Sequence, residues 1–186
     1  MNIGFAMCGS FCTFNAVFPA MEAVAKQYDV VPIISDNVRR IDSRFGTADS
    51  HLRRIRDICG RDPLCTIEGV EPIGPKKLLD ALVIAPCTGN TLAKLAHSIA
   101  DTPVTMAAKS HLRNGRPVLI AVSTNDALAG AAENIGKLLS RKHYYFVPFG
   151  QDDPIGKPTS MVADFAKIPE ALAMALEGKQ LQPILL

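Results

Sequence analysis

Apolar residues occur along this chain in continuous runs rather than in strict alternation with polar ones. The clearest runs cover 1–7, 28–35, 81–85 and 117–122. Runs without alternation are typical of parallel strands that are covered on both faces. Shorter apolar stretches predict two further strands at 64–67 and 144–148. Pro86 is expected to end the strand that begins at residue 81.

Between these runs, apolar residues recur at the spacing of amphipathic helices. The two clearest sets are Val17, Met21 and Val24, and Leu92, Leu95, Ala96 and Ile99. Similar spacing predicts helices near 52–59, 134–139 and 164–177. Strands and helices therefore alternate, which predicts an α/β fold with a three-layer, Rossmann-like (flavodoxin-like), doubly wound and mainly parallel sheet. We expect residues 1–186 to form a single domain.

Short turns of small polar residues follow four of the predicted strands. They cover 8–13, 35–37, 86–91 and 123–126. The carboxyl ends of parallel strands meet at one edge of a doubly wound sheet, so we expect these turns to line one crevice and to share one ligand. Gly9-Ser10 stands where a helix begins, and N–H groups, a hydroxyl and the helix dipole there suit a single phosphate. The alternative is that this pair serves only the backbone geometry of the turn.

The turn after residue 85 carries side chains that can cap a helix, namely Thr88, Asn90 and Thr91. Asn90 is expected to act as cap and clamp together, bonding both a backbone carbonyl and a polar ligand edge. Cys87 lies near the same helix start, where a thiol pKa can be lowered. We favour a small buried packing role for Cys87 over a reactive one.

Composition excludes several classes of protein. No apolar run approaches the ~20 residues that span a bilayer, so no membrane association is expected. A net charge of +2 argues against nucleic-acid binding. The five cysteines form no zinc-finger spacing, so no metal is expected, and their odd number fits a reducing, cytoplasmic location.

Basic residues concentrate in one stretch of the chain. They are Arg39, Arg40, Arg44, Arg53, Arg54, Arg56 and Arg61. The favoured interpretation is a solvated helical face. The alternative is a site for a dianionic ligand or for an acidic partner surface.

Two common nucleotide fingerprints are missing. The first turn, Gly4-Phe-Ala-Met-Cys-Gly9-Ser10, lacks the G-x-G-x-x-G pattern of dinucleotide-binding folds, and no Walker loop is present. Binding of a nicotinamide dinucleotide by this chain alone is therefore disfavoured.

Two turns together resemble one known family. The pairing of Gly9-Ser10-Phe11 with Ala85-Pro-Cys-Thr-Gly-Asn-Thr91 and Lys94 is similar to the flavoproteins that include cysteine decarboxylases and flavin prenyltransferases, whose hallmark turn reads Pro-Ala-Ser-Ala-Asn-Thr. The resemblance implies FMN as a cofactor, with its phosphate near Gly9, Ser10 and Ser35. It also implies a homo-oligomer, a trimer or a multiple of one. The residues that it places along the ribityl chain and the ring are Phe11, Pro86, Cys87, Thr88, Asn90, Thr91, Ser123 and Asn125.

Longer stretches resemble one branch of this family. They are Glu71-Pro-Ile-Gly-Pro-Lys-Lys77, Thr102-Pro-Val-Thr-Met-Ala-Ala-Lys109, His111-Leu-Arg-Asn114, Ser123-Thr-Asn-Asp126 and Val147-Pro-Phe-Gly-Gln-Asp-Asp-Pro154. This resemblance implies one of the two polypeptides of an oxidoreductase that acts on a small pyridine dicarboxylate, with NADP bound by the other polypeptide.

The chain also departs from the family's decarboxylases. They carry a histidine where this chain has Pro72, and a late cysteine, whereas the last cysteine here is Cys87. Without that imidazole and thiol, cysteine decarboxylation is not expected. Thr88 and Gly89 also replace the Ser and Ala of the hallmark. Three interpretations stay open: a flavin-binding catalytic subunit, a flavin-free partner subunit, and a stand-alone lyase or prenyltransferase.

Two histidines and one loop complete the candidates. His97 is expected at the surface or in an interface, and His111 with Arg113 after a helix end, as a cap or as a substrate contact. The polar segment 149–158 is of a length that commonly serves a function or an interface. Asp152 and Asp153 within it are expected to cap a turn.

Overall fold

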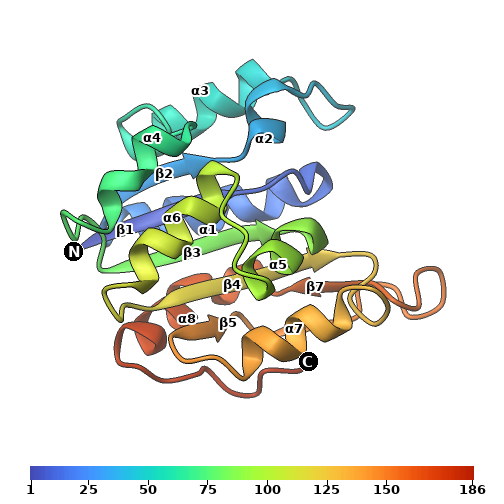
Figure 1. Cartoon of the computed structure of the whole chain (residues 1–186). Helices are drawn as coiled ribbons and strands as arrows, with labels where there is room; N and C mark the ends of the chain where they lie inside the picture. Colours follow the sequence, from blue (N-terminus) through green and yellow to red (C-terminus); the bar gives the residue numbers. More distant parts are fainter.

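The computed structural model describes residues 1–186 and contains one seven-stranded sheet (Figure 1). Its strand order is β2-β1-β3-β4-β7-β6, and β5 pairs with β4 outside this path. The strands are β1 (Asn2–Met7), β2 (Asp29–Ile34), β3 (Ala81–Cys87), β4 (Val118–Thr124), β5 (Tyr144–Phe146), β6 (Phe149–Gly150) and β7 (Met161–Ala163). The predicted α/β, Rossmann-like architecture is confirmed.

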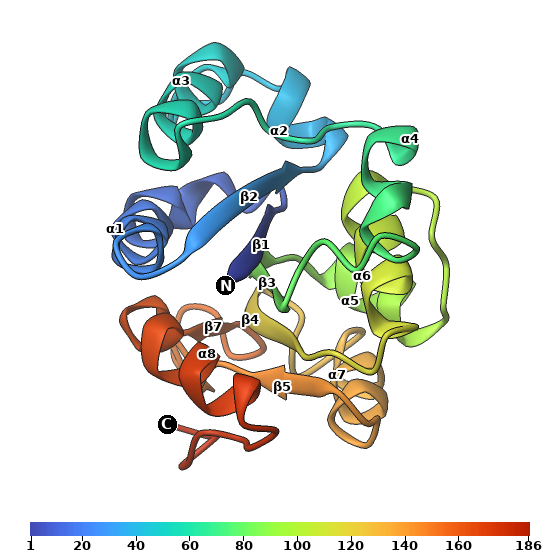
Figure 2. The ribbon, with the colours of Figure 1, turned by 90° about the vertical axis from the view of Figure 1, so that its left-hand side faces the viewer.

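Helices cover both faces of this sheet (Figure 2). One face carries α1 (Phe14–Ala25), α3 (Ala48–Cys59) and α8 (Ile168–Leu176). The other carries α5 (Gly89–Ala96), α6 (Pro103–Leu112) and α7 (Ala132–Leu139). The shorter helical segments are η1 (Phe11–Thr13), α2 (Asp36–Arg40), α4 (Ile67–Val70), η2 (Glu71–Ile73) and η3 (Phe165–Lys167).

The central strands are buried along their whole length, as their continuous apolar runs predict. All seven residues of β3 are buried, and so are the first six of β4. β1 pairs in parallel with both β2 and β3, and β3 pairs in parallel with β4. Sandwiched between two helical layers, these strands have no solvent face, which is why polar alternation is missing from them.

Pro86 does not end its strand, so that prediction was wrong. β3 continues to Cys87, which pairs with Val122, and the register against β4 shifts between Ile84 and Cys87. A proline cannot donate to the ladder, but its carbonyl can accept, and here the Pro86 carbonyl accepts from the Cys8 N–H at 3.3 Å. The Ala85–Pro86 peptide bond is cis.

Two further expectations needed correction. The predicted strand at 64–67 is only an isolated bridge between Leu64 and Ile33. The strand-helix alternation also does not persist to the end, because β7 runs antiparallel to both β4 and β6. No helix of the protein is long and apolar enough to cross a membrane.

Candidate functional site

The turns at the carboxyl ends of β1, β3 and β4 meet around one cleft of about 590 Å³. In Figure 1 the parallel strands point toward this side of the molecule, and the segments around 41–47 and 151–158 project from the same side. The predicted site residues that line the cleft are Gly9, Ser10, Phe11, Thr88, Ser123 and Asn125. The expectation that turns distant in sequence share one crevice is confirmed for these three strands.

Two hydroxyls meet at the junction of the first and fourth turns. Ser10 Oγ lies 2.8 Å from Ser123 Oγ, and the Thr13 hydroxyl donates to the Ser10 carbonyl at 2.8 Å. Ser10 is half-buried, so its hydroxyl has room beside it rather than being packed against apolar neighbours. Gly9 lies close to the start of α2, and a Cβ there would lie 3.1 Å from the Asn37 Cβ, which is a tight contact.

The turn after β3 is organised by threonines. Thr88 is the N-cap of α5 and accepts from the Thr91 N–H at 3.4 Å, while the Thr91 hydroxyl donates to Cys8 Sγ at 3.3 Å. Asn90 is exposed, and its side chain makes no hydrogen bond within the chain. The capping role expected of Asn90 therefore belongs to Thr88, since the first residue before the helix is the one whose oxygen can reach the free N–H groups.

Gly89 explains one departure from the family's hallmark turn. A Cβ at this position would lie 2.8 Å from both Asp126 Oδ1 and Thr124 Oγ1. The Thr124 hydroxyl donates to the Asp126 carboxylate. The loop after β4 thus packs directly on the loop after β3, and even an alanine would require it to shift.

Five of the predicted binding residues do not line the cleft in this chain. They are Ser35, Pro86, Cys87, Asn90 and Thr91. Ser35 caps α2 by accepting from the Val38 N–H at 3.5 Å. Cys87 is fully buried, and desolvation raises the pKa of its thiol well above the usual value. That confirms the packing role for Cys87, because the reactive thiolate form is disfavoured there.

The arginine-rich stretch forms mainly surface ion pairs. The pairs are Arg40–Asp36, Arg53–Asp49, Arg54–Glu22, Arg56–Asp62 and Arg61–Asp29. The solvated-face interpretation is therefore confirmed for these five. Arg44 has no acidic partner and lines the cleft together with Ser43 and Phe45. The prediction of site residues missed this turn, because its only signal was a position within a charge run.

The other charged group at the cleft is already compensated. Lys157 Nζ lies 2.8 Å from Asp152 Oδ2, and both residues line the cleft. The pKa of Lys157 is raised and that of Asp152 lowered, in both cases with their mutual hydrogen bond among the causes. Asp153 Oδ1 accepts from the Gly156 N–H at 2.8 Å, which confirms its turn-capping role.

The two histidines considered above have different outcomes. His97 is exposed at the end of α5, as expected. His111 is neither a cap nor a cleft residue: it is fully buried in the last turn of α6, and its Nε2 lies 3.1 Å from the Pro117 carbonyl oxygen. Burial lowers the pKa of His111 to about 4, so the ring is neutral at pH 7 and donates to that carbonyl.

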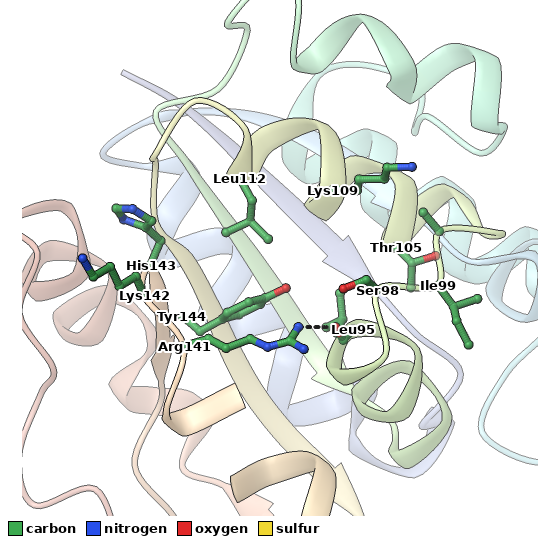
Figure 3. Close-up of a pocket in the computed structure, with 11 residues that line it drawn as sticks. Leu95, Ser98, Ile99, Thr105, Lys109, Leu112, Arg141, Lys142, His143 and Tyr144 are labelled. Atoms are coloured by element: carbon green, nitrogen blue, oxygen red, sulfur yellow. Dashed lines mark hydrogen bonds between the residues drawn. The ribbon is translucent and has the colours of Figure 1, made fainter. Parts of the chain in front are cut away.

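A second, smaller cavity of about 350 Å³ lies between α5, α6 and the start of β5 (Figure 3). Leu95, Leu112 and Tyr144 form much of its wall, and the Lys142 and His143 side chains point away from them in this view. The Arg141 guanidinium is committed to the end of α5, donating to the carbonyls of Leu95 at 3.1 Å and Ala96 at 2.6 Å. None of the predicted site residues lines this cavity.

The donor set of the cleft suits a phosphorylated, planar organic cofactor rather than a metal. The hydroxyls of Ser10 and Ser123 converge there from two strand ends, Phe11 lines the same cleft, and the volume is in the range of small-molecule sites. No group of three or more histidine, cysteine or acidic side chains could hold a metal ion.

Sequence and structure comparisons define the class. The family model described as Flavoprotein matches residues 3–170, and the chain belongs to this family.

Within it, the chain is 46% identical over 185 residues to a dipicolinate synthase polypeptide of Bacillus subtilis (strain 168), the one designated B, and the match covers 99% of this chain and 92% of that protein. The crystal structure of the corresponding polypeptide of dipicolinate synthase from Bacillus halodurans C superposes with a TM-score of 0.91 at 42% identity, covering 100% of this chain and 95% of that one. The FMN-dependent cysteine decarboxylase SpaF shares the fold, with a TM-score of 0.71 at 24% identity over 94% of this chain and 97% of that one.

Proposed function

We propose that this chain is the flavoprotein-family component of a dipicolinate synthase, which oxidises dihydrodipicolinate to dipicolinate (pyridine-2,6-dicarboxylate) during spore formation. The observation that carries the proposal is the 46% identity to the Bacillus subtilis polypeptide, which extends over 99% of the chain. The designation B of that relative implies a second dipicolinate synthase polypeptide, designated A, as the partner. The missing dinucleotide fingerprint in the first turn supports placing the NADP site on that partner.

The cleft at the strand ends is the proposed site of FMN. Gly9 and Ser10 would hold the phosphate, and Phe11, Thr88, Ser123 and Asn125 would lie along the ribityl chain and the ring. A bound flavin supplies reversible hydride acceptance. This chain's own contribution would be to bind and orient: the Ser10–Ser123 hydroxyl pair offers hydrogen bonds, and the Thr88-capped turn keeps β3 and α5 in a fixed relation.

Asn90 supports a site completed between copies of this chain. It occupies a hallmark position of the family, yet it is exposed and outside the cleft of the single chain. We infer a cytoplasmic homo-oligomer, a trimer or a multiple of one, in which Asn90 reaches the flavin of a neighbouring copy. Light scattering of the purified chain measures the mass, and a monomer would contradict this part of the proposal.

Reconstitution tests the function. Dihydrodipicolinate oxidation should require both this chain and the nicotinamide-binding partner. Full NADP-dependent turnover by this chain alone would contradict the assignment of the NADP site to the partner. A visible spectrum of the purified chain separates a flavin-binding component from a flavin-free one, since bound flavin absorbs at about 450 nm. A stand-alone decarboxylase is disfavoured by Pro72 in η2 and by the lack of any cysteine after Cys87.

A further inference from the structure

The turn at 41–47, between α2 and α3, is held in a fixed shape by its own hydrogen bonds. The Ser43 N–H donates to the Gly46 carbonyl at 3.0 Å, and the Gly46 N–H donates to the Ser43 carbonyl at 3.1 Å. Ser43 Oγ accepts from the Phe45 N–H at 3.1 Å, and Asp42 accepts from the Ala48 N–H at 2.8 Å. Arg44 and Phe45 are therefore presented at the tip of a closed turn rather than on a loose loop.

An aromatic cluster supports this turn from behind. Gly46 has φ +136°, and a Cβ there would lie 2.6 Å from His51 Cε1. His51 is buried, with its ring 4.8 Å from the Phe14 ring and 6.1 Å from the Phe11 ring, measured between centroids. Phe11 lines the cleft, so the turn and the cleft wall are packed on the same imidazole.

Arg44 is the one uncompensated charge among the cleft-lining residues. The only other cation there is Lys157, which is paired with Asp152. The Arg44 guanidinium makes no hydrogen bond or ion pair and lies 4.8 Å from the centroid of the Phe45 ring. Phe45 itself is 41% exposed, so an aromatic face stands beside a free guanidinium at the mouth of the cleft.

We propose that the Arg44–Phe45 tip is the element of the cleft that recognises a planar aromatic carboxylate. The guanidinium takes one carboxylate group through paired N–H···O hydrogen bonds, and the Phe45 ring packs on the ring of the ligand. This inference rests on the proposed function for its ligand class, because pyridine-2,6-dicarboxylate combines a flat ring with two carboxylates. It goes further in assigning the recognition to a turn outside the flavoprotein hallmark.

Equilibrium binding of pyridine-2,6-dicarboxylate to the purified full chain, followed by calorimetry, tests the assignment. Arg44→Ala should weaken binding about tenfold or more, and Arg44→Lys should recover part of the loss, since a lysine keeps the charge but not the planar fork. The matched control is Arg53→Ala, which removes the same charge from an exposed pair on α3 and should leave the affinity unchanged. FMN affinity, measured by quenching of flavin fluorescence, should change less than about twofold in Arg44→Ala.

Each other outcome overturns the assignment. Unchanged dicarboxylate affinity in Arg44→Ala places the carboxylate elsewhere, and an equal loss of FMN affinity makes Arg44 an anchor of the cofactor phosphate. No binding of the dicarboxylate by the unaltered chain refutes the assignment as well. Failure of the proposed function is seen separately, as absence of oxidation when the nicotinamide-binding partner is added. Arg44-dependent binding without such oxidation would leave the recognition element standing.

Discussion

The two ends of the central sheet both carry polar side chains but differ in what those side chains contact. At the amino end, the Arg116 guanidinium is hydrogen-bonded within the chain. It donates to the carbonyls of Lys77 and Leu79, and it lies 3.4 Å from the Asp80 carboxylate. At the carboxyl end, Arg44 has no partner, and the Ser10–Ser123 pair faces a cleft of about 590 Å³. The difference indicates that polar groups with partners inside the chain stabilise the fold, whereas polar groups without such partners, beside a cleft, are available to a ligand.

The largest expected effect concerns His111 at the amino end. Its pKa is lowered from 6.5 to about 4, so below pH 6.5 the unfolded chain binds a proton that the folded chain excludes. The contribution of neutral His111 to stability should therefore be complete above pH 6.5. As the pH drops to 4, the free energy of unfolding should fall by about 3 kcal/mol. Urea unfolding of the wild type and of His111→Gln, which cannot titrate, measures the contribution.

The matched control for this pH dependence is His97→Gln, which alters an exposed ring at the end of α5. In this variant the free energy of unfolding should change with pH as steeply as in the wild type. His51 also has a pKa lowered by burial, so a residual slope in the same direction is expected in His111→Gln. If the free energy of unfolding depends on pH in His111→Gln as steeply as in the wild type, His111 makes no contribution to the loss of stability in acid, and the prediction is contradicted.

Arg116→Ala should give the next largest effect. It removes charged hydrogen bonds that join the start of β4 to the segment before β3. The free energy of unfolding should therefore fall by about 2 kcal/mol. Arg113→Ala removes the same charge from an exposed, unpaired neighbour and should cost little. Thermal melting of both variants decides it, and equal melting temperatures would contradict the structural role of Arg116.

Thr88 and Asn90 give a smaller contrast within the carboxyl end. Thr88→Ala removes the cap of α5 and should cost about 1 kcal/mol of stability, whereas Asn90→Ala should cost less than about 0.5 kcal/mol. If Asn90 reaches a flavin in a neighbouring copy, Asn90→Ala should instead lose FMN affinity by about tenfold. A lowered melting point with unchanged affinity in Asn90→Ala would return the capping role to Asn90.

The sequence predicts the main strands well because they are fully buried. β1, β2, β3 and β4 all begin within a residue or so of their apolar runs, since a strand covered on both faces needs an unbroken run. β6 and β7 were missed because they have two and three residues, too few for any periodicity. The continuation of β3 through Pro86 depends on a carbonyl contact with the turn after β1 that no local pattern shows.

The candidate site was predictable only in part. Gly9, Ser10, Thr88 and Ser123 follow buried strands, so the fold class alone brings them together. The sequence could not show that Arg44 lacks an ion-pair partner while other arginines of the stretch have one. Arg54 pairs with Glu22 and Arg61 pairs with Asp29, and each partner is 32 residues away along the chain. The burial of His111 was equally hidden, since it depends on how α6 packs before β4.

The central claim is that ligand binding belongs to the carboxyl end and fold stability to the amino end. FMN titration and thermal melting of Ser10→Val and Arg116→Ala, measured side by side, test it most directly. Ser10→Val should lose FMN affinity by about tenfold or more while its melting temperature falls by at most about 4 °C. Arg116→Ala should instead lower the melting temperature and leave the FMN affinity unchanged. Unchanged FMN affinity in Ser10→Val, or a loss of affinity in Arg116→Ala as large as its loss of stability, would contradict the account.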